Sequence, residues 1–475
     1  MVDLNRARRR FLHGDCTPFQ IHSQPNSSMR FMKTVLPYRP TLRTRTRPLF
    51  RLALLLGLLP LKLLAQFCPN GVTVAGGNGQ LPNPEFVVVD AAGNVYVSDR
   101  NLDRIMKFPP NSTQGEVFAG GNGEGAGLNQ LNQPRGLALD QQGNLLVADR
   151  ENDRVLLFPP NSTSLTLGTV VAGGNEEGNG STQLYNPTDL TLDQQGYLYV
   201  YSSGINRVVK FPPNSTSATS GTTVAGGNNS GPNLNQIDGC DGIAVDQDGN
   251  LYVSDMFNYR VLKFPPNSTS LTSGTIVAGG NGRGSGSDQL FIPYDIVVDG
   301  SGNLYVADQG NSRVQVFPLG STSLTAGTTL VGNNQLASSK GLFLNGNGDL
   351  FVVDGVNNRV LRFSPFRFTG QPPTSQTVCT GATVTATVSV SGTVSGYQWY
   401  KDNVSLGTSQ QQATLSLTGV DTDDAGSYYV VVTGCSSLTS TAFALTVNEA
   451  LTVSISPSTT AGSAGSLPAR REPTP

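Results

Sequence analysis

The side chains that could do chemistry in this chain recur at a fixed spacing. An Asp is followed five residues later by an Arg in five copies: Asp99–Arg104, Asp149–Arg154, Asp255–Arg260, Asp308–Arg313 and Asp354–Arg359. Such a pair could orient a substrate, but Asp also accepts backbone N–H bonds in turns, and Arg can bridge a hairpin. A functional site usually departs from the symmetry of a repeat. Recurrence in nearly every copy therefore favours a structural role.

The positions that differ from copy to copy are better candidates for a binding site. They are the residue that enters the first strand of each copy, the loop between its second and third strands, and nearby aromatic side chains. The candidates are Arg135, Asp241, Tyr294, Lys340, Arg150, Phe257 and Tyr185, with Glu85, Thr188, Tyr259 and Phe291 at related positions. We expect both sets of loops to face the same end of the molecule, where variation and aromatic rims are typical of a contact surface. Packing of these aromatics within the loops is the alternative.

The chain lacks the residues of common hydrolytic and metal sites. His13 and His22 are its only histidines, and both precede the expected signal cleavage point. The exported chain would then have no Ser–His–Asp triad and no His-ligated zinc. Cys68 and Cys240 show no CxxC spacing, and Asp246-Gln-Asp248 lacks the distal Glu of a calcium loop. We assign no catalytic residue and expect no metal and no cofactor.

A repeat of about fifty residues must position these side chains. Its copies begin near Phe86, Gly136, Asp189, Gly242, Asp295 and Gly341. In the second copy, the apolar run 136–140, a Gly-Asn turn, the run 145–149, a second turn and the run 155–158 before Pro159-Pro160 predict three short strands. The run 169–174 predicts a fourth. Four antiparallel strands per repeat are typical of a β-propeller blade.

The number of strands predicts how the repeats close. The three-strand unit and the Val-Ala-Gly-Gly-type fourth strand each occur six times, but the first fourth strand, at 72–77, precedes every three-strand unit. The last unit, which ends at Phe363, has no fourth strand after it. We therefore predict an all-β fold: a six-bladed β-propeller over 66–366, in which residues 72–77 complete the last blade and remove an open edge.

The repeated phrases Gly-Asn-Leu-Tyr-Val-[Ala/Ser]-Asp and Asn-x-Arg-Val-x-x-Phe resemble NHL repeats over about residues 72–364. The resemblance implies a six-bladed propeller. Two positions depart from it, since Ser202 and Asn345 stand where other copies have Asp. Amidating lyases built on similar repeats rely on histidine-bound metal, and the predicted exported chain has no histidine to support that activity.

Residues 370–448 differ in character and predict a second domain after a Gly370-Gln-Pro-Pro linker. The motifs Trp399-Tyr-Lys-Asp and Asp424-Ala-Gly-Ser-Tyr428 resemble those of an immunoglobulin-like β-sandwich, which implies a buried Trp and a tyrosine corner. Val388 and Val430 occupy the usual cysteine positions, and Cys379 and Cys435 lie just outside them. The resemblance thus implies a displaced disulfide between Cys379 and Cys435.

The N-terminal 65 residues are interpreted as a signal or targeting segment. Four arginines precede an apolar run from Leu52 that is broken by Pro60 and Lys62, which favours a cleaved signal over a membrane anchor, the alternative interpretation. Residues 1–28 need not be native, because Met29 or Met32 gives a more ordinary length. Residues 449–475 are interpreted as a tail or a truncated next module. We expect secretion, or a place at the cell surface, with no stable membrane span after cleavage.

The charge distribution argues against a nucleic-acid partner. Residues 1–65 hold 12 of the 31 Lys and Arg but two of the 33 Asp and Glu, which leaves 19 basic and 31 acidic residues and a net charge of −12 after residue 65. Such a body repels phosphate backbones.

Taken together, these features predict an exported, non-catalytic binding or scaffold protein with a protein or glycan ligand. The alternative is a propeller lyase or hydrolase with Asp, Arg and Tyr at the mouth of the central channel.

Overall fold

The computed structural model describes residues 66–67, 70–332 and 335–449. The expected signal segment 1–65, Cys68 and the tail from residue 450 lie outside the described residues. The described part is all-β with short 3-10 turns, as predicted. It contains no helix that is long and apolar enough to cross a membrane.

The second repeat shows how sequence produces one sheet. Strands β7 (Pro134–Leu139), β8 (Leu145–Asp149), β9 (Arg154–Phe158) and β10 (Thr169–Gly173) pair antiparallel in chain order. Gly143 has a φ of +81°, which the tight turn between β7 and β8 requires and a side chain disfavours. Pro159 follows β9 and ends it, because proline cannot donate to the ladder. All four predicted strands of this repeat are confirmed.

Six four-stranded antiparallel sheets of this kind occur in the described residues. We number them sheet 1 to sheet 6 by their first strands, β3, β7, β11, β15, β19 and β23. Sheet 1 is β3 (Pro84–Val89), β4 (Val95–Asp99), β5 (Arg104–Phe108) and β6 (Glu116–Gly120); sheet 3 is β11 (Pro187–Leu192), β12 (Leu198–Ser202), β13 (Arg207–Phe211) and β14 (Thr222–Gly226). Sheet 4 is β15 (Ile243–Val245), β16 (Leu251–Asp255), β17 (Arg260–Phe264) and β18 (Thr275–Gly279); sheet 5 is β19 (Pro293–Val298), β20 (Leu304–Asp308), β21 (Arg313–Phe317) and β22 (Thr328–Val331).

Sheet 6 draws its strands from both ends of the repeat region. It consists of β23 (Ser339–Leu344), β24 (Leu350–Asp354), β25 (Arg359–Phe363) and, in the outer position, β2 (Val72–Gly76). Strand β2 pairs antiparallel with β25, with Gly76 opposite Arg359 and Val72 opposite Arg362. The N-terminal strand therefore takes the place predicted for it.

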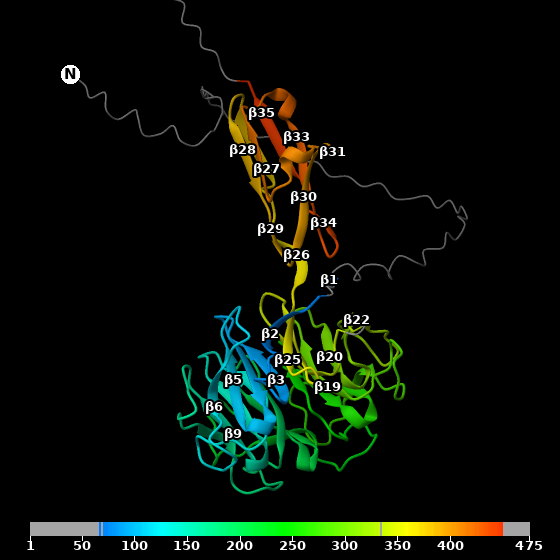
Figure 1. Ribbon diagram of the computed structural model, residues 1–475. Coiled ribbons are helices and arrows are strands. Elements are labelled where there is room, and N and C mark those ends of the chain that lie inside the picture. Colours follow the sequence, from blue (N-terminus) through cyan, green and yellow to red (C-terminus); the bar gives the residue numbers. More distant parts are fainter. Residues whose placement is uncertain (1–65, 68–69, 333–334, 450–475) are drawn as a thin grey trace, which may run out of the picture.

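The first strands of the sheets lie side by side around a common centre. Each contacts the first strands of the sheets before and after it, and the contacts return from β23 to β3. Figure 1 shows the sheets gathered at one end of the molecule, with the blue N-terminal strands beside the yellow strand β25. Because the first strands are arranged in this way, residues in equivalent positions of different repeats lie at the same end of the ring of sheets.

The core repeats with the sheets. The Phe that ends the third strand is at most 1 % exposed in every sheet: Phe108, Phe158, Phe211, Phe264, Phe317 and Phe363. Asn side chains that follow the fourth strand of one sheet form hydrogen bonds with the backbone of the next sheet. Asn122, for example, donates to the carbonyl of Ser164, and Asn175 donates to that of Ser217. The Gly-Gly-Asn phrase thus serves packing between repeats.

A second group of strands follows the sheets. Its largest sheet has the order β27-β35-β33-β30-β31, with β34 also on β33, and β28 pairs with β32. The bounds are β27 Ser375–Cys379, β28 Thr383–Thr387, β29 Ser389–Ser391, β30 Val394–Lys401, β31 Val404–Ser405, η6 Thr408–Gln410, β32 Thr414–Thr418, η7 Thr422–Asp424, β33 Gly426–Gly434, β34 Ser437–Thr439 and β35 Phe443–Asn448. Trp399 and Tyr428 are fully buried in its core, and the Tyr428 hydroxyl donates to the carbonyl of Asp424 at 2.6 Å.

Strand β26 (Pro365–Gly370) joins the two groups of strands, as Figure 1 shows. It pairs with β1 (Gln66–Phe67) on one side and with β29 on the other. Phe366 belongs to the apolar core of the second group. The segment before the predicted linker is therefore a paired strand.

Candidate functional site

The residues that enter the first strands meet at the centre of the ring of sheets. We call Glu85, Arg135, Asp241, Tyr294 and Lys340 the central cluster. Four of them lie in β3, β7, β19 and β23, and Asp241 lies two residues before β15. Arg135 Nη1 lies 3.0 Å from Asp241 Oδ1, and Arg135 Nη2 lies 3.5 Å from Glu85 Oε2. Positions that are up to 255 residues apart in the sequence are thus in contact.

Tyr294 and Lys340 complete the cluster around Glu85. The Tyr294 hydroxyl accepts a hydrogen bond from Arg135 and donates one to Glu85. Lys340 Nζ lies 2.7 Å from the other carboxylate oxygen of Glu85. The Arg135 guanidinium also lies over the rings of Phe86 and Tyr294, at 5.9 and 5.5 Å from their centroids.

The electrostatics of the central cluster favour paired ions. Burial alone would raise the pKa of Glu85, but Arg135 and Lys340 lower it, and the net shift is downward. Burial would lower the pKa of Arg135, but Asp241, Tyr294 and Glu85 raise it. Burial raises the pKa of the Tyr294 phenol well above its ordinary value. Two carboxylates therefore face two cations, and the phenol stays protonated.

Most of the central cluster is buried. Glu85, Tyr294 and Arg135 are 2 %, 6 % and 8 % exposed. Arg135 and Tyr294, which we predicted as contact residues, therefore hold the cluster together and do not form an exposed rim. Thr188, the sixth residue of this kind, is also buried and donates to the carbonyl of Cys240 at 3.2 Å.

Aromatic side chains lie at this end of three neighbouring sheets, numbers 3, 4 and 5. Tyr185, Phe257 and Phe291 each pack against a glycine, namely Gly204, Gly239 and Gly310. We call these three rings, with Tyr259 and Arg283, the aromatic rim. Arg283 covers Phe291, with its guanidinium carbon 3.7 Å from the ring centroid. The ring centroids of Tyr259 and Phe291 are 6.3 Å apart. Phe257 is 56 % exposed.

The short 3-10 turns between second and third strands carry part of the aromatic rim. They are η1 Arg100–Leu102, η2 Arg150–Asn152, η3 Ser203–Ile205, η4 Met256–Asn258 and η5 Gln309–Asn311. Phe257 lies in η4. Arg150 is the first residue of η2. It pairs with Glu151, and its Nη1 lies 3.4 Å from Gln133 Oε1. The loops that we expected at one end of the molecule thus surround the central cluster.

The recurring Asp–Arg pairs have the structural role that we preferred. In sheet 2, Arg154 Nε lies 2.7 Å from Asp149, whose other oxygen accepts the backbone N–H of Asn132. Five such pairs are described, and each Asp is fully buried. In sheet 3, Ser202 replaces the Asp, and the Nε of Arg207 is buried without a partner. Burial lowers the pKa of Arg207, because no carboxylate compensates.

The channel that the first strands surround contains two carboxylates that we did not single out. Asp189 and Asp295 are each 4 % exposed and line a cavity of about 340 Å³ with apolar residues of all six first strands. They accept the backbone N–H groups of Ile243 and Leu342, both at 2.7 Å. Burial raises both pKa values, that of Asp295 to about 7, and their mutual repulsion raises that of Asp189 further. At the equivalent position the other copies have Gly or Phe. This difference between copies is the feature of the sequence that could have identified the two carboxylates.

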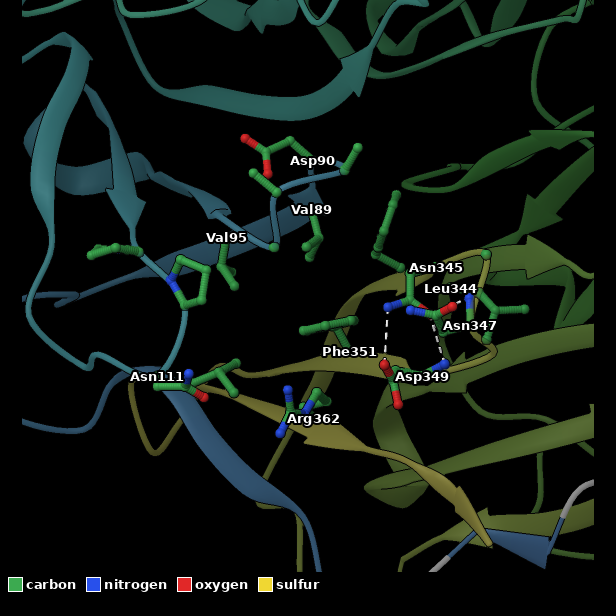
Figure 2. Close-up of a pocket in the computed structure, with 18 residues that line it drawn as sticks. Val89, Asp90, Val95, Asn111, Leu344, Asn345, Asn347, Asp349, Phe351 and Arg362 are labelled. Carbon is green, nitrogen blue, oxygen red and sulfur yellow. Dashed lines mark hydrogen bonds between the residues drawn. The ribbon is translucent and has the colours of Figure 1, made fainter. Parts of the chain in front are cut away.

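A larger cavity, of about 650 Å³, lies between sheets 1 and 6 (Figure 2). Asn345 and Asp349 face each other at its edge: Asn345 Nδ2 donates to Asp349 at 3.0 Å, and Asp349 N–H donates to Asn345 at 2.8 Å. Four of the other five repeats have Asp and Asn in the reverse order, as in Asp140 and Asn144, and the third has Tyr197 at the second position. The departure at Asn345 is therefore a reciprocal exchange that preserves the turn.

Comparison with known proteins identifies the repeat. The NHL repeat model matches residues 131–158 and 292–317. Among solved structures, a protein described as a putative gluconolactonase is similar at 16 % identity and a TM-score of 0.47, over 64 % of this chain and 96 % of its own. A streptogramin B lyase is similar at 12 % identity and a TM-score of 0.41, over 63 % and 99 %.

A catalytically inactive virginiamycin B lyase from Staphylococcus aureus, solved with quinupristin, is similar at 11 % identity and a TM-score of 0.42, over 62 % of this chain and 98 % of its own. These likenesses are too distant to carry an activity to this chain. The matched repeat model and the repeated sheets together establish an all-β protein that contains NHL repeats, in an arrangement consistent with a β-propeller.

Proposed function

We propose that residues 66–366 form a six-bladed β-propeller closed by β2, and that residues 370–448 form an immunoglobulin-like sandwich. The contacts of the first strands, which return to β3, and the pairing of β2 with β25 support the first assignment. The buried Trp399 and the hydrogen bond from Tyr428 to the chain just before it support the second. The sandwich would act as a spacer or a second adhesive unit.

We propose that the protein is exported and acts as a non-catalytic binding or scaffold protein. One end of the propeller would contact a protein or glycan through the aromatic rim. The observation that carries this proposal is a difference in exposure between the central cluster and the aromatic rim. The charged groups of the central cluster are buried and paired with one another, whereas Phe257 and Arg283 are exposed. Exposed aromatic and Arg side chains are common anchors of interfaces.

An enzyme remains the second candidate, because Arg135, Asp241 and Tyr294 converge as that hypothesis requires. A lyase or hydrolase would need an open pocket at these groups. The cavities described above are lined by other residues. Both cations of the cluster, Arg135 and Lys340, are already paired with Glu85 and Asp241, so neither is free to stabilise a charge that develops on a substrate.

Capture of a ligand tests the proposed function. The full chain is immobilised and exposed to extracts from its native surroundings, and bound material is compared with that of F257A and of L271A. Leu271 is 80 % exposed in the loop between β17 and β18, outside the aromatic rim, so it is a matched surface control. We expect F257A to lose most of the bound material and L271A to keep it. Equal capture by both variants would reject the aromatic rim as the binding face.

A further inference from the structure

The aromatic rim repeats one arrangement, an aromatic ring packed on a glycine, although the residues that form it stand at different sequence positions in different repeats. In sheets 3 and 5, the ring comes from the loop before the first strand, and the glycine comes from the 3-10 turn: Tyr185 with Gly204, and Phe291 with Gly310. The backbone confirms the equivalence, because the N–H of Gly204 donates to the carbonyl of Tyr185, and that of Gly310 donates to the carbonyl of Phe291.

Sheet 4 exchanges the two roles. The turn supplies the aromatic residue, Phe257, whose N–H donates to the carbonyl of Asp238 in the equivalent bond. The glycine, Gly239, now belongs to the entry loop and lies under the ring: a Cβ there would be 2.7 Å from Phe257 Cδ2 and Cε2. Three consecutive sheets thus each place one aromatic ring on bare backbone at the same junction.

This construction stops at the neighbouring sheets. In sheet 2 the equivalent bond joins Glu151 to the carbonyl of Asn132, and in sheet 1 Asn83 and Asn101 bond to each other across the junction at 3.0 Å. In sheet 6 the stem of Lys340 covers Gly355. The rings therefore form an arc over half of the ring of sheets, next to the central cluster.

We propose, on the basis of the binding function above, that this arc binds a β-linked pyranose oligosaccharide. Phe257 is 56 % exposed and rests on Gly239, so it can offer its outer face as a flat platform, whereas the guanidinium of Arg283 stacks on Phe291. The negative face of an aromatic ring attracts the weakly positive C–H groups that a β-linked pyranose displays on its faces. Phe257 would stack on one pyranose unit, and the N–H groups of Arg283, which stacks on Phe291, would contact the hydroxyl groups of another unit of the same chain.

Polar groups of the aromatic rim suit the hydroxyl groups of a sugar. Arg283 is exposed, carries several N–H donors and lies over Phe291, and Tyr259 adds a phenol beside the same ring. Separate rings among glycine and polar residues fit a sugar chain better than a protein partner, whose hot spots lie at the centre of a continuous desolvated patch. Stacking of nucleic-acid bases is disfavoured by the net charge of −12 after residue 65.

Calorimetric titration of the full chain with cellohexaose and with chitohexaose tests this inference, with maltohexaose as the α-linked comparison. We expect at least one of the two β-linked probes to bind and maltohexaose to bind more weakly. F257A should weaken binding at least fivefold, F257Y should restore it, and L271A should leave it unchanged. Thermal melting verifies that each variant is folded.

Failure of the inference can be distinguished from failure of the proposed function. If neither β-linked probe binds, or if F257A binds them as wild type does, the glycan inference is wrong. If, in addition, F257A abolishes capture of a protein from the native surroundings, the proposed binding function stands with a protein partner. If neither probe binding nor capture depends on Phe257, both proposals fall.

Discussion

Single residues show how closely the repeat constrains its positions. Asp149 accepts a backbone N–H with one oxygen and the Arg154 guanidinium with the other, and Ser202 can do only the first. The Arg207 Nε is consequently a buried donor without an acceptor. An unmet buried donor costs about 1–3 kcal/mol.

Replacing Ser202 by Asp should therefore stabilise the protein. The new carboxylate would accept the Tyr185 N–H, as the serine does, and also reach the Arg207 Nε, so we expect a gain of about 1 kcal/mol in the free energy of unfolding. Chemical denaturation measures it. S202A is the control and should lose stability, because it removes both hydrogen bonds to Tyr185. A less stable S202D would show that burial of the charge outweighs the new pair.

Arg135 should be the most sensitive residue of the central cluster. R135M leaves Glu85 and Asp241 without their shared cation, and removing one partner of a buried ion pair costs about 3–5 kcal/mol. R150M is the matched control. Its pair with Glu151 is more exposed, so the loss should be about 1 kcal/mol or less. Equal losses in denaturant unfolding would contradict the buried, paired cluster.

The channel carboxylates predict a pH dependence. Burial raises the pKa of Asp295 to about 7, above its value near 4 in an unfolded chain. The folded state then binds more protons between these values, so stability falls as pH rises through this window, by at most about 1.4 kcal/mol per pH unit for one proton. D295N should flatten the fall, measured as melting temperature from pH 4 to 8. An unchanged slope in D295N and in D189N would show that neither group titrates there.

Elements were predicted well where the repeat supplied several copies of the evidence. Alternating apolar runs and Gly or Pro punctuation located all strands of sheet 2 within a residue or two. The sequence also indicated which residues enter the first strands. It could not show that Arg135 and Tyr294 are buried, because spacing along a strand gives the end of the sheet but not the packing of side chains from other sheets. Asp189 and Asp295 do stand out in the sequence, because the other copies have Gly or Phe at this position, but only the packing of the sheets shows that both carboxylates line the channel.

Strands β27 and β33 carry a prediction of their own. Cys379 ends β27 and Cys435 directly follows β33, and we expect a disulfide between them that closes a loop of about 57 residues and stabilises by roughly 4 kcal/mol. Thiol labelling in denaturant, without reductant, of the protein produced in an oxidising compartment should modify Cys240 and spare these two. Cys240 is a free, buried thiol and serves as the internal positive control. Labelling of both Cys379 and Cys435 would refute the bond.

At the scale of the whole molecule, one short strand decides whether the sheets form a closed unit. Strand β2 contributes five residues to sheet 6, and its pairing with β25 joins the beginning of the repeat region to its end. Without β2, the outer edge of β25 would lose its partner. The shared end of the sheets, on which the central cluster and the aromatic rim depend, rests on this closure.

Thermal unfolding of the chain without residues 66–78 tests this closure most directly. Calorimetry of the intact protein and of the deletion variant, with hydrogen exchange of the β24 amides in sheet 6 and of the β3, β11 and β19 amides in other sheets, shows whether the loss is local or shared. We predict a lower melting temperature and faster exchange in all four strands, because opening a ring weakens every sheet together. An unchanged melting temperature, or faster exchange confined to sheet 6, would contradict a closed ring.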